Sequence, residues 1–407
     1  MNCRNCEAFL KNIFIDLGHS PPSNAYLTKN NLYQSEIYYP LKVLVCNQCW
    51  LVQTEDYTSA DKLFTSEYAY FSSTSTSWLN HAKNYADKMI KELNLNSASH
   101  VIEIGSNDGY LLKNFVLAKI PCLGIEPTSN TADFSEKIGI PVLRKFFGKN
   151  LAHKLAIDEK KADLIIGNNV YAHVPDINDF TMGLKKILKK HGTITLEFPH
   201  FMNLIKHTQF DTIYHEHFSY LSIYTVCKIF EKAGLRLFNV EELNTHGGSL
   251  RVYGCHIEDI RKTQNTVDLL LQKEKKFGLQ KIETYKDFQS RADKIKNDLL
   301  KFLSDQKVKG KKVVGYGAAA KGNTLLNYCE IKEDLLPIIF DAAPSKQGCF
   351  MPGSHIPILP PKHLIEINPD YVLILPWNIS DEIKVQNAIL KKNGTQFLVA
   401  VPQLKVL

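Results

Sequence analysis

Two short apolar runs, each followed by a glycine-bearing turn and the start of a helix, constrain the fold most. The first run, at residues 101–104, precedes Gly105-Ser106-Asn107-Asp108-Gly109. The second, Lys312-Val313-Val314, is apolar after its first residue and precedes Gly315-Tyr316-Gly317-Ala318-Ala319-Ala320-Lys321-Gly322. This is the order of an α/β unit, because glycine lets the backbone approach a ligand at the carboxyl end of a strand. The sequence therefore predicts two α/β folds in one chain.

The first fold carries an acidic residue where a ribose would bind. A second apolar run, at residues 122–125, ends in Glu126. A carboxylate at the tip of the second strand can accept hydrogen bonds from both ribose hydroxyls of an adenosine. The turn has Gly105 and Gly109 with Asn107 between them and lacks the full G-x-G-x-x-G of a dinucleotide site. It therefore favours S-adenosylmethionine over NAD.

The remaining elements of the first fold follow in the expected order. A third strand at residues 162–167 precedes a polar stretch, and an amphipathic helix follows with Phe180 and Leu184 on its apolar side. We expect Gly192 to cap this helix before a strand at residues 193–198. The residues expected to bind the cofactor are the acids, the turn residues and a polar strand end: Glu103, Gly105, Asn107, Gly109, Glu126 and Asn168.

The second fold is too small for a complete dinucleotide site. Ala320 stands where a third glycine would be needed, and fewer than 100 residues follow it. The next strand, at residues 336–340, ends in Asp341, and later strands are expected at 371–375 and 397–401. Backbone N–H groups at the helix start, with Lys321 nearby, would suit the diphosphate of a smaller nucleotide. Lys346 lies in a turn that could line the same crevice.

Two pairs of cysteines predict a metal site. Of nine cysteines, four form the C-x-x-C pairs Cys3/Cys6 and Cys46/Cys49, a spacing that aims two sulfurs at one tetrahedral zinc. The 39 residues between the pairs exceed the usual spacing of roughly 15 to 20, so the insert should carry strands of its own, with residues 36–41 as the expected position. With four sulfur ligands the zinc would have no position for water, and it should hold the fold without performing chemistry.

Side chains able to move a proton are densest at Tyr214-His215-Glu216-His217. Because His200 and His207 lie upstream, a second metal site is one interpretation of this region. The spacing lacks the H-E-x-x-H pattern of a helical zinc site, and tyrosine and serine are interspersed, so we favour a site of proton transfer. We expect His200 or His207 to be a buried core histidine.

Together these motifs resemble the nucleotide-sugar C-methyltransferases of deoxysugar biosynthesis, typified by C-3 methyltransferases of dTDP-4-keto-sugars. The resemblance covers nearly the whole chain. It implies an α/β protein with a class I methyltransferase Rossmann-like domain, a C-terminal Rossmann-like domain for the nucleotide sugar, and a small N-terminal four-cysteine zinc-binding module. The expected boundaries are 1–75 for the zinc module, 76–255 for the S-adenosylmethionine domain, 256–309 for a helical connector and 310–407 for the nucleotide-sugar domain.

The resemblance also implies roles for individual residues. Tyr214, Glu216 and His217 match family residues at the reacting carbon. His173 and Tyr68 match residues that face the site. A base removes a proton beside a ketone while hydrogen bonds hold the enolate oxygen, and we expect His217 to be that base, with Tyr214 as the alternative. The residues expected to contact the nucleotide sugar are Tyr68, Tyr70, Arg251, Gly317, Ala318, Lys321, Gly322, Asn323, Asp341 and Lys346.

Composition argues against several other classes of protein. The formal net charge of +7 is modest and scattered, without the basic stripe of a nucleic-acid-binding protein. No apolar run approaches the roughly 20 residues of a membrane span, and the N-terminus has no signal segment, so we expect a cytoplasmic protein. We also expect a monomer, although no sequence motif specifies the oligomeric state. The alternatives are an RNA or other small-molecule methyltransferase, an NAD-dependent oxidoreductase, and a nucleotide-sugar-binding protein without catalysis.

Overall fold

The computed structural model describes residues 1–57 and 71–407, which form two compact units of interleaved segments. The first unit comprises Met1–Lys11, Val45–Met202 and Phe218–Gln280. The second unit comprises Asn12–Leu44, Asn203–His217 and Lys281–Leu407. These units differ from the contiguous domains expected from the sequence. Most of the insert between the cysteine pairs and the whole Tyr214–His217 stretch belong with the C-terminal fold.

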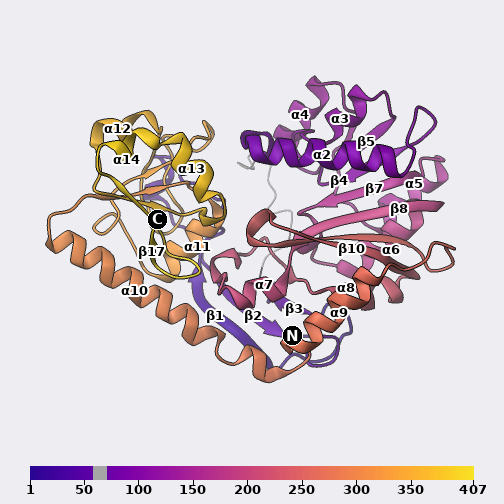
Figure 1. Ribbon diagram of the computed structural model, residues 1–407, viewed down its shortest axis with the longest axis horizontal. Coiled ribbons are helices and arrows are strands. Elements are labelled where there is room, and N and C mark those ends of the chain that lie inside the picture. The colour runs from indigo at the N-terminus through magenta and orange to yellow at the C-terminus, as the bar shows by residue number, and fades with distance from the viewer. Residues whose placement is uncertain (58–70) are drawn as a thin grey trace. The chain divides into compact units, whose positions relative to one another are not determined.

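A seven-stranded sheet forms the core of the first unit (Figure 1). The strand order is β10-β11-β8-β7-β4-β5-β6, and β11 runs antiparallel to both of its neighbours while β8, β7, β4, β5 and β6 are parallel. This is the sheet of a class I methyltransferase fold, as the sequence predicts. The strands are β4 (Val101–Ile104), β5 (Cys122–Ile125), β6 (Val142–Leu143), β7 (Ala162–Asn168), β8 (Leu188–Pro199), β10 (Leu235–Leu243) and β11 (Ser249–His256).

Helices cover this sheet, and α2 (Thr76–Glu92) shows how. The side chain of Ser75 caps its first turn by accepting from the N–H of Trp78 at 3.3 Å. Its buried residues recur at helical spacing and share a core with Val101 and Leu164 of the sheet. The other helices of this unit are α3 (Leu112–Leu117), α4 (Ser129–Lys137), α5 (Lys149–Ile157), α6 (Ile177–Ile187), α8 (Ile223–Lys232) and α9 (Asn265–Phe277), while α7 (Phe201–Lys206) begins in the first unit and ends in the second.

Gly192 does not cap α6, contrary to expectation. Strand β8 begins at Leu188, directly after the helix, and Gly192 lies inside the strand. A Cβ at position 192 would come within 2.9 Å of the Ala162 carbonyl oxygen on the neighbouring strand β7. The glycine therefore serves close packing within the sheet, which a helix-capping pattern does not distinguish.

Glu274 of α9 joins elements of the first unit from a buried position. Its carboxylate, which is 1% exposed, accepts from the N–H groups of Ile223 at 2.7 Å and Tyr224 at 3.0 Å, at the start of α8. His200 Nε2 lies 2.8 Å from the same carboxylate. The first N–H groups of a helix have no partner within it, so a buried acceptor here satisfies them. The sequence predicts that either His200 or His207 is a buried core histidine, and His200, which is 1% exposed, is one.

A second, largely parallel sheet forms the core of the second unit (Figure 1). Its order is β14-β13-β12-β15-β16-β17, with only β17 antiparallel to its neighbour. The strands are β12 (Val313–Tyr316), β13 (Ile339–Phe340), β14 (Ile358–Leu359), β15 (Tyr371–Ile374), β16 (Gln396–Val399) and β17 (Lys405–Val406). The helices are α10 (Phe288–Val308), α11 (Ala320–Tyr328), α12 (Lys362–Ile367), α13 (Ser380–Gln386) and α14 (Ala388–Lys392).

The insert between the cysteine pairs supplies two neighbouring strands, β1 (Asn12–Ser20) and β2 (Tyr39–Val45). Phe14 of β1 stacks on Phe288 at the start of α10, with ring centroids 4.3 Å apart. The strand expected near residues 36–41 starts three positions later, and β1 was not expected. Its burial pattern departs from strict alternation and it contains Gly18, so its sequence gives a weak strand signal.

Within residues 1–57 and 71–407, no helix has both the length and the apolar character needed to cross a membrane. This agrees with the sequence, in which no apolar run is long enough.

Replacing Glu274 with alanine should leave two helix N–H groups and His200 buried without their acceptor. We expect the free energy of unfolding to fall by about 3 to 5 kcal/mol, measured by urea titration of circular dichroism. The matched control is Glu231→Ala on α8, which removes a contact with Lys228 between side chains that are 66% and 50% exposed. Its effect should stay below about 1 kcal/mol. Equal losses in the two variants would contradict the role given to Glu274.

Candidate active site

The four paired cysteines converge in the first unit. One sulfur atom from each of Cys3, Cys6, Cys46 and Cys49 lies within 4.8 Å of the others. Zinc–sulfur bonds of about 2.3 Å place tetrahedral ligands about 3.8 Å apart, close to the 3.5 Å between the Cys3 and Cys49 sulfurs. The side-chain amide of Gln53 also donates to Cys3 Sγ at 3.2 Å, as suits a thiolate. The site fits a metal ion with four sulfur ligands.

Arg4, between the first two cysteines, ties this cluster to the strands beside it. Its guanidinium donates to the backbone carbonyls of Thr54, at 3.1 Å, and Phe218. Thr54 ends β3 (Val52–Thr54), which pairs with β9 (Ser219–Tyr220) directly after Phe218. The cysteine cluster therefore holds the point at which the chain leaves the Tyr214–His217 stretch.

The first glycine turn and Glu126 meet at one edge of the first sheet. Strands β4 and β5 are parallel and in register from Val101 and Cys122 onward, so the turn and the acid leave the sheet together. The Glu126 carboxylate accepts from the N–H groups of Asn107 and Thr128, both at 2.9 Å. Burial raises the pKa of Glu126. The Thr128 hydroxyl also donates to this carboxylate, at 2.5 Å, so three of its roughly four lone pairs are used and one remains for a ribose hydroxyl.

Gly105 and Gly109 have conformations that other residues rarely adopt. Their φ angles are +67° and +78°, and a Cβ at Gly109 would lie 2.5 Å from the side chain of Ile140. The turn therefore requires glycine at both ends. Glycine is also the residue expected where a backbone approaches a ligand closely.

Two buried polar side chains, Glu103 and Asn168, stand beside this turn. Glu103 of β4 is fully buried, and Asn168 ends the neighbouring strand β7. Among the described residues, neither carboxylate oxygen of Glu103 and neither amide atom of Asn168 has a hydrogen-bond partner. Burial, followed by the charges of Asp108 and Glu126, raises the pKa of Glu103 well above its usual range. Polar atoms of this kind suit the polar groups of a bound S-adenosylmethionine.

His173 lies at the same edge of the first sheet. It closes a 3-10 helix (Tyr171–His173) a few residues after β7. The residue before His173, Ala172, accepts a hydrogen bond at its carbonyl from the N–H of Phe218, at 2.9 Å. The first unit thus gathers His173 with all six residues predicted to bind the cofactor.

The second unit contains the predicted proton-transfer residues, and Tyr214 and His217 form a hydrogen-bonded pair there. His217 Nδ1 lies 2.8 Å from the carbonyl oxygen of Thr212, which can only accept, so Nδ1 carries the proton. Nε2 is then the acceptor, and the Tyr214 hydroxyl donates to it at 2.8 Å. The rings lie 4.0 Å apart, and Tyr214 is the more exposed partner. This geometry gives His217 a defined tautomer with its basic nitrogen on a tyrosine hydroxyl.

The two residues between them have different surroundings. Glu216 is 2% exposed, and its Oε1 accepts from the side-chain amide of Asn24 at 2.7 Å. His215 Nε2 lies 3.2 Å from the Pro40 carbonyl and 3.3 Å from the Tyr39 carbonyl, and burial lowers the pKa of His215. His215 thus contacts the backbone of the insert, whereas Glu216 stays grouped with Tyr214 and His217 as a predicted proton-transfer residue.

The second glycine turn and Asp341 repeat the arrangement of the first sheet. Asp341 follows β13, and its carboxylate accepts from the N–H groups of Ala318 and Ala343, both at 2.7 Å. Lys346 Nζ donates to the Ala318 carbonyl at 2.8 Å. A Cβ at Gly317, where φ is +87°, would lie 2.4 Å from Pro376. The structure therefore brings Gly317, Ala318, Asp341 and Lys346 together as the sequence predicts.

Lys321 and Asn323, in the first turn of α11, have unlike environments. Lys321 Nζ donates to Asn378 Oδ1 at 2.6 Å and lies 4.6 Å from the ring centre of Trp377, and burial lowers the pKa of Lys321. Its ammonium is thus already engaged. Gly322 packs α11 against Leu375, the residue directly after β15, since a Cβ at position 322 would lie 2.8 Å from that side chain. Asn323 is fully buried, and in the described part of the chain its amide has no hydrogen-bond partner, so it can receive a ligand group.

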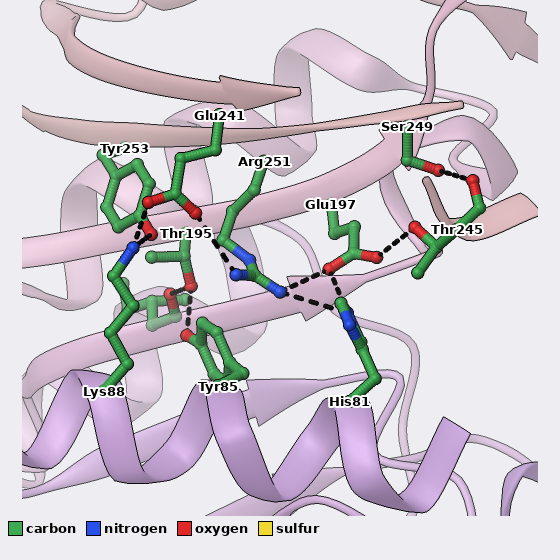
Figure 2. A network of polar contacts seen from close by, with 11 residues as sticks. His81, Tyr85, Lys88, Thr195, Glu197, Glu241, Thr245, Ser249, Arg251 and Tyr253 are labelled. Carbon is green, nitrogen blue, oxygen red and sulfur yellow. Dashed lines mark hydrogen bonds and ion pairs between the residues drawn. The ribbon is translucent and has the colours of Figure 1, made fainter. Parts of the chain in front are cut away.

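Arg251 is part of a buried network rather than an open anion site (Figure 2). The sheet register places it between Glu241 on β10 and Glu197 on β8. Its guanidinium, on a residue 4% exposed, lies 2.8 Å from Glu197 and 3.4 Å from Glu241. His81 of α2 also contacts Glu197, at 2.9 Å. Burial alone would raise the pKa of Glu197, but His81 and Arg251 outweigh it and lower the pKa.

The sequence did not identify several polar residues around the predicted sites. Asn24 and Tyr26 lie in the insert, which has no motif at these positions. Asp211, fully buried three residues before Tyr214, accepts from Trp377 Nε1 at 2.7 Å, and burial raises its pKa to about 6. Only the density of acids and imidazoles near Tyr214 could have drawn attention to Asp211. Tyr68 and Tyr70 lie outside the described residues.

Models of known protein families match three parts of the chain. They describe a C-methyltransferase C-terminal domain at residues 244–402, a methyltransferase domain at residues 78–240 and a zinc binding domain at residues 3–64. A curated relative, the C-methyltransferase NovU of Streptomyces niveus, is 31% identical over 393 residues, which are 97% of this chain and 93% of the relative. The likeness therefore spans both units.

Solved methyltransferase structures match a smaller part. A magnesium protoporphyrin IX methyltransferase from Synechocystis is 13% identical with a TM-score of 0.34, covering 44% of this chain and 79% of that one. An S-adenosylmethionine-dependent methyltransferase from Clostridium acetobutylicum is 9% identical with a TM-score of 0.35, covering 44% and 92%.

Replacing Glu126 with glutamine should weaken the binding of S-adenosylhomocysteine by about 10- to 100-fold in isothermal titration calorimetry. The reason is the loss of an ionised acceptor for ribose hydroxyls. Because burial raises the pKa of Glu126, the wild-type affinity should also begin to fall at a higher pH on acidification than for an ordinary glutamate. Glu136→Gln on α4, whose carboxylate meets Arg144 at the surface, is the control and should bind normally. Unchanged affinity in the Glu126 variant would exclude the ribose contact.

Proposed function

This chain belongs to the C-methyltransferase family, and we propose that its acceptor is a dTDP-linked 4-keto-deoxysugar methylated at C-3 through base-catalysed enolisation. The activity of the family is S-adenosylmethionine-dependent C-methylation. The observation that carries the finer proposal is the Tyr214–His217 pair with its defined tautomer. Carbon becomes a nucleophile for a methyl group only after losing a proton, and a carbon beside a ketone loses one to a base of this strength.

The proposed base is the pair, with His217 as the final proton acceptor. The tyrosine oxygen takes the C-3 proton as its own proton passes to His217 Nε2, and the electrons of the C–H bond move to the ketone oxygen. The imidazolium formed keeps its bond from Nδ1 to the Thr212 carbonyl, which stabilises the positive charge. Removal of the proton by His217 itself, with Tyr214 displaced, gives the same products.

Three further groups complete the proposed reaction. His173 would donate to the enolate oxygen, and Glu216 would orient a sugar hydroxyl. Bound S-adenosylmethionine supplies an electrophilic methyl group to C-3. The first glycine turn, with Glu126 on the ribose, would hold that donor.

The second fold would hold the nucleotide sugar. The turn at Gly317 and Ala318 faces the carboxylate of Asp341, and Lys346 places a positive charge beside it. A diphosphate there would meet backbone N–H groups and an ammonium. Asn323 offers an unused amide for a polar group of the nucleotide or sugar.

We also propose that the four-cysteine site holds one structural zinc ion in a cytoplasmic, monomeric enzyme. The donors are four sulfurs in tetrahedral reach, which zinc accepts with no position left for water. The ion would therefore stabilise the first unit and leave the chemistry to other residues.

The His217→Asn variant should lose proton exchange at C-3. In deuterium oxide without a methyl donor, the wild type should exchange the C-3 proton of a dTDP-4-keto-6-deoxyhexose, and the variant should be slower by about 100- to 10,000-fold. Tyr214→Phe should also be slower, because the pair loses its shared proton. Proton and deuterium NMR of the sugar follows the exchange.

The control is His207→Asn, which alters a histidine outside the pair and should exchange at the wild-type rate. Exchange at the wild-type rate in His217→Asn would remove His217 from the mechanism.

A panel of dTDP-, UDP- and GDP-linked 4-keto-sugars tests the acceptor. Failure of the wild type to exchange or methylate any of them would refute the proposed substrate class.

Cys46→Ser should lower the zinc content from one ion per chain to well below one, measured by inductively coupled plasma mass spectrometry. Loss of a ligand should also lower the melting temperature, because metal-binding free energy contributes to folding. Cys349→Ser, which alters a cysteine of the second unit outside the cluster, should keep both values. A wild-type protein purified without zinc, and unaffected by added zinc, would contradict the assignment.

A further inference from the structure

The insert between the cysteine pairs contacts the proposed catalytic stretch from within the second unit. The side-chain amide of Asn24 donates to Glu216 Oε1 at 2.7 Å. The carboxylate that receives this bond is buried, on a residue 2% exposed. A donor on one oxygen fixes the plane of a carboxylate and so determines where its second oxygen points. Asn24 is therefore in a position to set the direction of Glu216.

Two residues later, the same segment contacts the second glycine turn. The Tyr26 hydroxyl donates to the Ala318 carbonyl at 2.5 Å, and Lys346 donates to the same oxygen at 2.8 Å. The ammonium of Lys346 also lies 5.3 Å from the centre of the Tyr26 ring. Because the Ala318 N–H is held by Asp341, the turn is fixed on both sides of this residue.

Further contacts hold this segment in place. Leu27 and Phe350 exchange two backbone hydrogen bonds, of 3.0 and 2.8 Å. Farther along the insert, Glu36 accepts from the Gly353 N–H at 2.9 Å and lies 3.0 Å from His355 Nε2. Because the backbone of this segment is fixed, its side chains can hold the Glu216 carboxylate and the Ala318 carbonyl in defined positions.

We propose that Asn24 and Tyr26 are positioning residues of the methylation reaction, Asn24 acting through Glu216 at the reacting end and Tyr26 through Ala318 at the nucleotide end. The inference rests on the proposed sugar-nucleotide acceptor. It adds a task to the insert, which links the cysteine pairs and also sets the geometry of the acceptor site. A displaced catalytic group can lower a rate by about 100-fold, so the loss of these contacts should change the rate by a measurable amount.

The two variants Asn24→Leu and Tyr26→Phe should impair different kinetic parameters, kcat in the first and KM in the second. Asn24→Leu removes the donor while keeping the number and branching of the side-chain heavy atoms, and it should lower kcat by about 10- to 100-fold, with the KM for the nucleotide sugar changed by less than about twofold. Tyr26→Phe should raise that KM by about tenfold and leave kcat within about twofold. Affinity for S-adenosylhomocysteine should stay unchanged in both, because its proposed contacts lie in the first unit.

A double-mutant cycle separates positioning from a merely structural contribution. If Asn24 acts through Glu216, then Asn24→Leu should have little further effect on kcat in a Glu216→Gln background. A general loss of stability would instead multiply the two effects. Melting temperature and zinc content report folding, and Asn24→Ala replaces Asn24→Leu if the latter is unstable. If neither variant folds, the contact is structural and the proposal is wrong.

The outcomes distinguish this inference from the function on which it rests. A wild type that turns over no nucleotide-linked 4-keto-sugar would refute the proposed function. A wild type that turns over such a sugar, with Glu216→Gln impaired and Asn24→Leu at full kcat, would refute only the inference for Asn24. Multiplicative effects in the cycle would do the same. An unchanged KM in Tyr26→Phe would refute the inference for Tyr26.

Discussion

The convergence of four sulfur atoms within 4.8 Å is the constraint on which the chain path depends. It brings together the two ends of an insert whose middle, Asn12–Leu44, belongs to the other compact unit. With the proposed metal ion bound, this loop would be anchored at both ends and would have far fewer conformations than a free one. The residues that the insert carries, including Asn24 and Tyr26, can therefore occupy fixed positions without a regular element beneath them.

The two α/β sheets use one local device twice. In each, a carboxylate at the end of the second strand accepts from the backbone N–H of the neighbouring glycine turn, as Glu126 does from Asn107 and Asp341 does from Ala318. The device fixes the turn before any ligand binds. The residues proposed for proton transfer come from neither turn. They lie on the Asn203–His217 segment, so the residues proposed for ligand binding and those proposed for proton transfer are on separate parts of the chain.

Patterns of short range predicted much of this structure, and contacts of long range explain most of the rest. The central parallel strands of the two large sheets, both glycine turns and the cysteine cluster follow from local residue patterns. The partners of Arg251 could not be predicted, because they are set by the register of three strands, which no local pattern contains. Asn24 gives no sequence signal, since its partner is 192 positions away. The tautomer of His217 likewise depends on the Thr212 carbonyl and on a turn that only the folded backbone defines.

The interleaving of the units has a consequence for synthesis on the ribosome. The chain passes between units at positions 11/12, 44/45, 202/203, 217/218 and 280/281, so neither unit is a continuous piece. At about 5 to 20 residues per second, the insert emerges on the order of 10 to 50 s before the C-terminal segment with which it forms the second unit. During that interval β1, with Phe14 and Ile15 destined for burial, has no core to enter. Early closure of the cysteine cluster would keep this strand tethered until its partners are made.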